Sequence, residues 1–203
     1  MERFIDFLKH SAMTREQVRE AVFEVERLNI GRHGYGSAAF GANLHEAYER
    51  LSERDVTASE LEIVMGMARD ILQRPLVVLP GVEATLAELG KRHELTLFTK
   101  GERVEQQLKV DRSGLAPLFA RVVIAPEKDP AAYRELVTEH GLDPGRTWMV
   151  GNSPRSDINP ALEVGLGAVF VPHSRTWKLE LAEIVSSPRL IVVDRFEELC
   201  RHF

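Results

Sequence analysis

The chain has 203 residues, of which 44% are hydrophobic and 28% charged, values typical of a soluble globular protein with one or two domains. The formal net charge of −5 argues against nucleic-acid binding, and no apolar run is long enough to span a membrane. The first residues lack the basic and apolar regions of a secretion signal. A single cysteine, Cys200, excludes an internal disulfide bond and fits a reducing compartment. We therefore expect a cytoplasmic protein.

Residues 1–74 carry only helical signals. Two segments begin with a capping box, in which a threonine is followed three residues later by a residue that can bond back to it. These pairs are Thr14 with Gln17 and Thr57 with Glu60. Apolar residues recur at helical spacing after each pair. This part of the chain is expected to be a small helical bundle.

A glycine-rich loop interrupts the bundle. The helix that starts after Thr14 should end near Gly31, and another helix is expected over 38–51. The loop between them, Arg32–Ser37, carries a histidine and a tyrosine. It is either a substrate-contacting loop or a flexible surface loop, and both interpretations stay open.

From residue 75 onward, apolar strands alternate with helical segments at the spacing of βαβ units. Residues 75–81 close on Pro-Gly and should form a connector or a very short strand. Because the strands are apolar on both faces, we expect an α/β fold with a Rossmann-like parallel sheet flanked by helices. The expected strands cover 95–99, 121–125, 147–151, 168–172 and 190–193. The expected helices cover 82–92, 104–110, 130–140 and 158–164.

Polar residues follow three of these strands. They are Thr99–Gly101, Lys128 and the segment Asn152–Asp157. The carboxyl ends of strands in a doubly wound sheet converge, so these groups can meet at one site. A hydroxyl, an ammonium group and backbone amides suit a phosphate, while a carboxylate suits Mg²⁺.

Each of these residues also has a structural interpretation. Thr99 could be a turn residue or a helix N-cap, and Lys128 could be a solvated loop charge. Asp157 precedes an apolar helix and could be its N-cap. Asn152 and Ser153 could be ordinary turn residues. The joint placement of all five at strand ends favours the functional interpretation.

Three stretches resemble the second, third and fourth motifs of haloacid-dehalogenase-like (HAD-like) hydrolases. They are Leu97–Gly101, Pro126–Pro130 and Val150–Asp157, and they occur in the family's order on the expected elements. The resemblance covers residues 75–177. It implies that residues 75–203 are a HAD-like α/β core and that residues 1–74 are an α-helical cap.

The resemblance also implies roles for the site residues. Thr99 would bind the phosphoryl oxygen, Lys128 would steady the nucleophile and the transferring group, and Asp157 would hold Mg²⁺. Asn152 stands where many members have an acid, but some phosphatase-like members have a similar Gly-Asn-Ser turn. The implied phosphate-binding residues are Thr99, Lys100, Gly101, Asn152 and Ser153.

The family's first motif is absent from these residues. It is an apolar strand ending in Asp-x-Asp-x-Thr/Val, whose first Asp attacks phosphorus and whose second acts as acid and base. Asp6 lacks the second acid, and Asp55 and Asp70 lie in polar or helical contexts. We therefore expect an N-terminally truncated core without its nucleophile and without its first strand. That strand would lie between the strands ending at Thr99 and Gly151, and a homodimer is one way to fill the gap.

Two functions follow from the resemblance. The first is a Mg²⁺-dependent phosphatase that acts on a small phosphate ester through an aspartyl-phosphate, inactive without the Asp-x-Asp motif. The second is a non-catalytic relative that binds a phosphorylated ligand or a protein partner. A halo-acid substrate stays open, whereas a receiver domain is disfavoured because that fold has no cap. The coding DNA upstream of Met1 would discriminate, since an in-frame Asp-x-Asp stretch there favours the enzyme.

Overall fold

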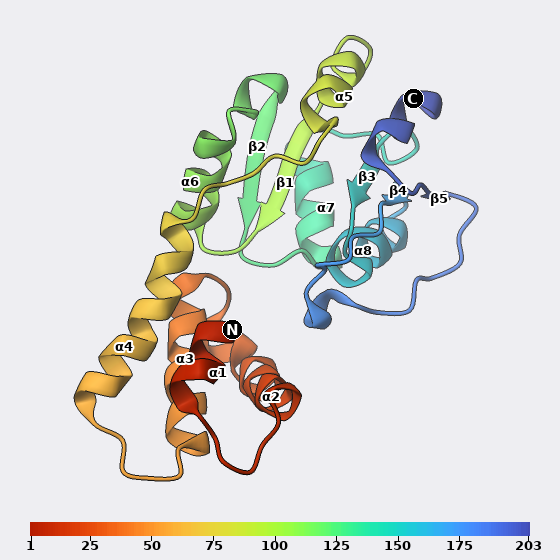
Figure 1. Cartoon of the computed structure of the whole chain (residues 1–203). Helices are drawn as coiled ribbons and strands as arrows, with labels where there is room; N and C mark the ends of the chain where they lie inside the picture. The colour runs from red at the N-terminus through yellow and green to blue at the C-terminus, as the bar shows by residue number, and fades with distance from the viewer. The chain divides into compact units, whose positions relative to one another are not determined.

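The computed structural model describes all 203 residues, which form two compact units, Met1–Leu76 and Val77–Phe203 (Figure 1). The first unit is helical and the second is α/β. Residues 75–81 form neither a helix nor a strand, in keeping with a connector. No helix is both long enough and apolar enough to cross a membrane.

The helical unit begins its second and fourth helices as the sequence predicts. At both Thr14 and Thr57 the threonine side chain accepts a backbone N–H, and the side chain of the third helical residue bonds back, which confirms the two capping boxes. The expected helix end near Gly31 is wrong: the helix continues to His33 and ends at Gly34, whose φ of 64° opens the turn. The helices are α1 (Glu2–Leu8), α2 (Arg15–His33), α3 (Ser37–Leu51) and α4 (Ala58–Arg69), followed by the short turn η1 (Asp70–Gln73).

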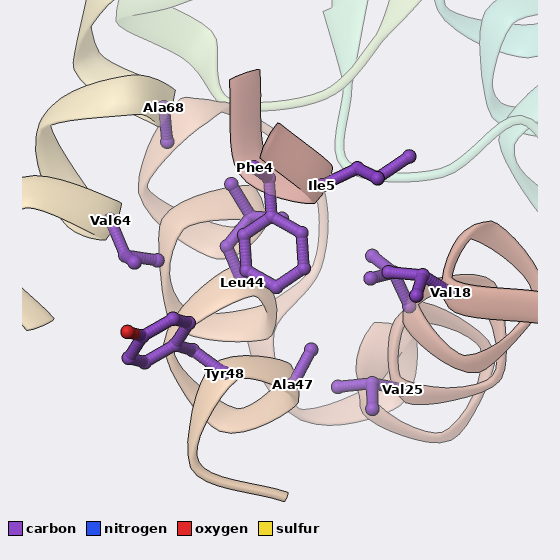
Figure 2. Packing of buried hydrophobic residues seen from close by; sticks show 10 residues of the cluster. Phe4, Ile5, Val18, Val25, Leu44, Ala47, Tyr48, Val64 and Ala68 are labelled. Carbon is purple, nitrogen blue, oxygen red and sulfur yellow. The ribbon is translucent and has the colours of Figure 1, made fainter. Parts of the chain in front are cut away.

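One apolar core joins all four helices of this unit. Figure 2 shows its side chains meeting between the helices, with Phe4 edge-on to Tyr48 at a ring-centroid distance of 6.2 Å. Burying a side chain of this size stabilises the fold by roughly 1.5–3 kcal/mol. The helical unit therefore has a core of its own. The labelled core residues are Phe4, Ile5, Val18, Val25, Leu44, Ala47, Tyr48, Val64 and Ala68.

The α/β unit confirms the expected fold class, with parallel strands and flanking helices. Its strands are β1 (Thr96–Lys100), β2 (Arg121–Ala125), β3 (Trp148–Gly151), β4 (Gly167–Phe170) and β5 (Leu190–Val192). Its helices are α5 (Val82–Leu89), α6 (Arg103–Ser113), α7 (Pro130–Glu139) and α8 (Asn159–Glu163). Shorter turns complete the unit: η2 (Ala116–Leu118), the π-helical turn η3 (Pro154–Ile158), η4 (Lys178–Glu180) and η5 (Phe196–Arg201).

The strands form two separate parallel sheets. One contains β1 and β2, with Phe98 opposite Val123, and the other has the order β3-β4-β5, with Val150 opposite Val169. No backbone pairing joins β1 to β3, so each of these strands is paired along one edge alone. In Figure 1 helix α7 is seen in the interval between β1 and β3.

Two apolar clusters cover the sheets. Tyr133 of α7 is fully buried and packs edge-on against Phe98 at a centroid distance of 5.1 Å. A second cluster joins Leu89, Val169 and Leu199. Gly167 permits close packing there, because a Cβ at this position would lie 2.3 Å from the Trp148 ring. Polar groups gather at the carboxyl ends of β1 and β3.

Candidate active site

The turn after β1 places Thr99 beside α6. Its hydroxyl donates a hydrogen bond to the side-chain oxygen of Gln106 at 3.1 Å. Gly101 closes the turn with a φ of 133°, a backbone conformation that favours glycine, and its N–H donates to the carbonyl of Ala125 at 3.0 Å. The turn therefore ties β1 to β2 at the edge where the other polar groups gather.

Lys128 is the buried cation of the site, with 6% of its surface exposed. Its ammonium group contacts the Asp157 carboxylate and donates to the carbonyl oxygen of Phe98 at 3.2 Å. Burial lowers the pKa of Lys128 from its ordinary value, while Asp157 acts in the opposite direction. The interpretation of Lys128 as a solvated loop charge is therefore wrong. It bonds the strand β1 to the turn that follows β3.

Asp157 is 8% exposed and has both carboxylate oxygens engaged. Oδ1 faces Lys128, and Oδ2 accepts the backbone N–H of Ser153 at 2.9 Å. The N-cap of this turn is Ser153, whose hydroxyl accepts the N–H of Ser156 at 2.9 Å. The interpretation of Asp157 as an N-cap is therefore wrong. Its carboxylate instead reaches back over the turn towards Gly151 and Lys128.

Lys100 lies in a second charged group, next to the first. Its ammonium group contacts Glu180 and Glu127 at 2.8 Å each and donates to the Ser156 hydroxyl at 2.8 Å. Lys100 and Ser153 thus belong to one hydrogen-bonded network, because both bind Glu180. In this network the carboxylates of Glu127 and Glu180 already bind the Lys100 ammonium group.

Glu180 was not identified from the sequence. It is 9% exposed, and its carboxylate accepts the Ser153 hydroxyl at 2.5 Å. Burial acts to raise the pKa of Glu180, but hydrogen bonds from Lys100, Ser153 and Ser156 outweigh it and hold the pKa below its ordinary value. No motif marks this residue, because it follows Ser153 by 27 positions and approaches it only in the fold.

Tyr133 is a second residue that the sequence did not single out. Its hydroxyl donates to the carbonyl oxygen of Ser156 at 2.9 Å. Burial raises the pKa of the tyrosine, so its hydroxyl stays protonated and can keep donating. This hydrogen bond therefore links the π-helical turn η3 to α7. Its position on the apolar face of α7 is the only signal of this role in the sequence.

Asn152 is placed differently from the other candidates. Its side chain is exposed, and its amide group donates to the Thr176 hydroxyl at 2.6 Å. It thus connects the turn to the segment after β4. The structure brings Lys128, Asp157, Lys100 and Ser153 together and directs Asn152 outward.

Comparisons with known proteins agree with this arrangement. A family model described as HAD-hydrolase-like matches residues 126–199. Phosphoserine phosphatase of Thermus thermophilus is 34% identical over 116 residues, which are 54% of this chain and 46% of that protein. Mouse N-acylneuraminate-9-phosphatase is 31% identical over 98 residues, which are 46% of this chain and 40% of that protein.

The crystal structure of a HAD-like family hydrolase from Xanthomonas campestris matches nearly the whole chain. It has a TM-score of 0.83 and 28% identity, and the match covers 99% of this chain and 81% of that one. In sequence and in fold the chain is similar to HAD-like hydrolases. The matches to the curated phosphatases, by contrast, span about half of those proteins or less.

The donor groups of this site determine whether it can hold Mg²⁺. Mg²⁺ takes six oxygen ligands and is usually held by one or two carboxylates together with substrate and water. The chain has no group of three His, Cys, Asp or Glu side chains that could hold a metal ion. Asp157 supplies one carboxylate, and Lys128 and Ser153 already bond its oxygens. These residues alone therefore do not complete a Mg²⁺ site.

Proposed function

We propose that this chain provides the helical cap and most of the α/β core of a HAD-like phosphatase that hydrolyses a small phosphate ester. The observation that carries the proposal is the buried pair of Lys128 and Asp157, which joins the carboxyl ends of β1 and β3. Thr99 lies next to Phe98, whose carbonyl Lys128 bonds. A hydroxyl, an ammonium group and a carboxylate are thus held at one strand-end edge, where α/β enzymes bind their ligands.

The proposed reaction needs an aspartate that these residues do not include. In it, a carboxylate oxygen attacks phosphorus and the bond from phosphorus to the ester oxygen breaks. The released alcohol takes a proton from a second acid, and water then cleaves the aspartyl-phosphate to give free phosphate. Lys128 offsets the negative charge of the attacking carboxylate and of the phosphoryl group, and Thr99 donates to a phosphoryl oxygen.

Mg²⁺ belongs to the same proposal. It would neutralise charge on the phosphoryl group, with Asp157 as one ligand and a carboxylate of the added aspartates as another. This requires the bond between Asp157 and Lys128 to loosen. The oxygen ligands of this chain supply only part of a Mg²⁺ site, so Mg²⁺ binding should depend on the added aspartates.

The experiment compares the 203-residue chain with a version preceded by an apolar strand that ends in Asp-x-Asp-x-Thr. Both are assayed with Mg²⁺ against phosphoserine, a sugar phosphate, a nucleoside monophosphate and a 2-halo-acid. We expect turnover of at least one phosphate ester by the extended protein, and none when the first Asp is replaced by Asn. Equal activity of the chain and its extended form would contradict the proposal.

A non-catalytic relative is the second candidate. It is favoured by the absence of Asp-x-Asp from these residues and by the full engagement of Asp157 and Lys100 within the chain. Such a protein would bind a phosphorylated ligand or a protein partner without turning it over. An extended protein that binds phosphate esters in a calorimeter but hydrolyses none would support this candidate over the phosphatase.

We also propose that the helical unit selects the substrate, as a cap does. The turn that follows α2 offers the Tyr35 side chain for contact, because Gly34 ends the helix with a positive φ. Replacing Tyr35 by Ala should then change KM for the preferred ester more than kcat. A change in kcat alone would contradict a role in substrate selection.

A further inference from the structure

A long connection without strands leads from β4 to β5, and Figure 1 shows it as a long blue loop. We call its part from Thr176 to Val185 the strap. Within the strap only Leu179 and Glu180 are buried, and Leu181, which follows them, is more than half exposed. Segments with so little buried surface open at a low cost in free energy. The strap therefore stays in place through specific polar contacts rather than through an apolar core.

Side chains of residues 152–159 fasten the strap to the turn η3 and to α8. Asn159, the first residue of α8, makes two of these bonds. Its amide group donates to the carbonyl oxygen of Glu183 at 2.8 Å, and its side-chain oxygen accepts the Val185 N–H at 3.0 Å. Further bonds join Asn152 to the Thr176 hydroxyl at 2.6 Å and Arg155 to the Leu179 carbonyl oxygen at 3.2 Å. Each bond involves a side chain, so each can break without disrupting the backbone ladder of a helix or strand.

Glu180 makes the charged contact of the strap. Its side chain is 12% exposed, and its carboxylate contacts the Lys100 ammonium group at 2.8 Å and accepts the Ser153 hydroxyl at 2.5 Å. A buried carboxylate is stable only while a cation or other hydrogen-bond donors compensate its charge. The burial of Glu180, and with it the closed position of the strap, therefore depends on the Lys100 ammonium group.

We propose that the strap is a latch, which opens when a phosphate oxygen takes the Lys100 ammonium group from Glu180. Without its cation, the Glu180 carboxylate regains hydration by moving outward together with the strap. Glu127, the other carboxylate that contacts Lys100, is 39% exposed and stays hydrated where it lies. The identification of Lys100 as a residue that receives phosphate rests on the proposed phosphatase function. The fastening of the strap by Glu180 rests on the contacts alone.

According to this proposal, a closed strap and a bound phosphate exclude each other. By linkage, any change that loosens the strap must then strengthen phosphate binding, and phosphate must loosen the strap. Asn159 separates this coupling from simple competition, because its side chain bonds the strap but not Lys100 or Glu180. Competition at Lys100 without movement of the strap would leave the phosphate affinity independent of Asn159.

The first experiment uses the 203-residue chain, with inorganic phosphate as the probe and sodium chloride at equal ionic strength as the control. Phosphate should speed hydrogen exchange in residues 176–185 several-fold and leave exchange in β4 unchanged. Calorimetry on the same samples gives the dissociation constant of phosphate. Equal exchange of the strap in phosphate and in sodium chloride would overturn the proposal.

Variants of the strap and its partners test the coupling. Asn159→Ala should speed exchange of the strap without phosphate and strengthen phosphate binding at least about threefold, because it removes two hydrogen bonds. Glu180→Gln should strengthen phosphate binding further, since the neutral amide no longer forms an ion pair with Lys100. Lys100→Met should abolish phosphate binding and leave the strap open with or without phosphate. Glu183→Gln, at an exposed position on the strap, is the matched control and should behave as the unaltered chain.

Phosphate binding that Asn159→Ala or Glu180→Gln fails to strengthen would also overturn the proposal. If Lys100→Met does not fold, these two variants still decide the question. Activity is a separate readout. Turnover by the extended protein without any response of the strap to phosphate would remove the latch and leave the phosphatase. A strap that opens with phosphate, in a chain whose extended form turns over no ester, would support the latch and remove the phosphatase.

Discussion

The Asp157 carboxylate occupies the space that a side chain at Gly151 would need. A Cβ at Gly151 would lie 2.1 Å from Oδ2 of Asp157 and 2.3 Å from its carboxyl carbon. The last residue of β3 must therefore be glycine for the carboxylate to keep its contacts with Lys128 and the Ser153 N–H.

Replacing Gly151 by Ala should push the carboxylate away from both partners. Forcing extra volume into a packed site typically costs about 1–3 kcal/mol, and denaturant unfolding of the α/β unit measures this loss. Gly31→Ala is the matched control, because a Cβ there meets nothing within 4 Å and the residue lies inside α2. The control should be neutral or slightly stabilising, as Ala favours a helix over Gly. An unchanged stability of Gly151→Ala would show that the carboxylate can move freely.

Lys128→Met should destabilise the α/β unit strongly. It leaves the Asp157 carboxylate buried without its cation, and breaking a buried ion pair on one side costs about 3–5 kcal/mol. The double variant Lys128→Met with Asp157→Asn should recover most of this loss, since the amide is uncharged and can still accept the Ser153 N–H. A double-mutant cycle of unfolding free energies tests the coupling. Additive losses would mean that the two side chains act independently.

Glu180 is expected to hold Lys100 and Ser153 in place. Glu180→Ala removes an acceptor from both, and hydrogen bonds to charged groups contribute about 1.5–3 kcal/mol each. Glu180→Gln should cost less, because its side-chain oxygen can still accept one of these bonds. Glu183→Ala, at an exposed position on the same segment, is the control and should stay near the unaltered stability. Equal losses for Glu180→Ala and Glu183→Ala in thermal unfolding would contradict a specific role.

The helical unit should lose stability in acid partly through Glu60. The Arg54 guanidinium and the capping box of Thr57 lower the pKa of Glu60 to about 2. Because the folded pKa lies below the ordinary value, this contribution is present above about pH 4.5 and is lost as the pH falls towards 2. Circular dichroism of unfolding between pH 5 and pH 2 should show a steeper decline for the unaltered chain than for Glu60→Gln. Identical pH profiles would remove Glu60 from this effect.

Local features of this chain could be predicted from the sequence. The capping boxes at Thr14 and Thr57 depend on residues three positions apart, and β2 follows from a run of apolar residues between turns. The glycine at 34 is a local signal too, yet the sequence pattern predicts that the helix ends near Gly31. A glycine with open space around it is tolerated inside a helix, and the sequence does not show which glycine takes a positive φ.

Contacts between distant residues could not be predicted in the same way. Lys128 lies between acids in the sequence, which suggested a solvated charge, but the fold buries it against Phe98 and Asp157. Asn152 lies within the best motif and nevertheless turns outward to Thr176. Glu180 reaches Lys100 across 80 positions of sequence without any motif to mark it.

The sequence by itself determined the order of helices and strands and the residues that follow each strand, because these depend on neighbours within a few positions. It also showed which acidic motif these residues do not contain. The tertiary structure alone decided which polar side chains meet, because burial and pairing depend on elements far apart in the chain. The structure also shows that the strands form two separate sheets, because pairing depends on where strands far apart in the sequence lie in space.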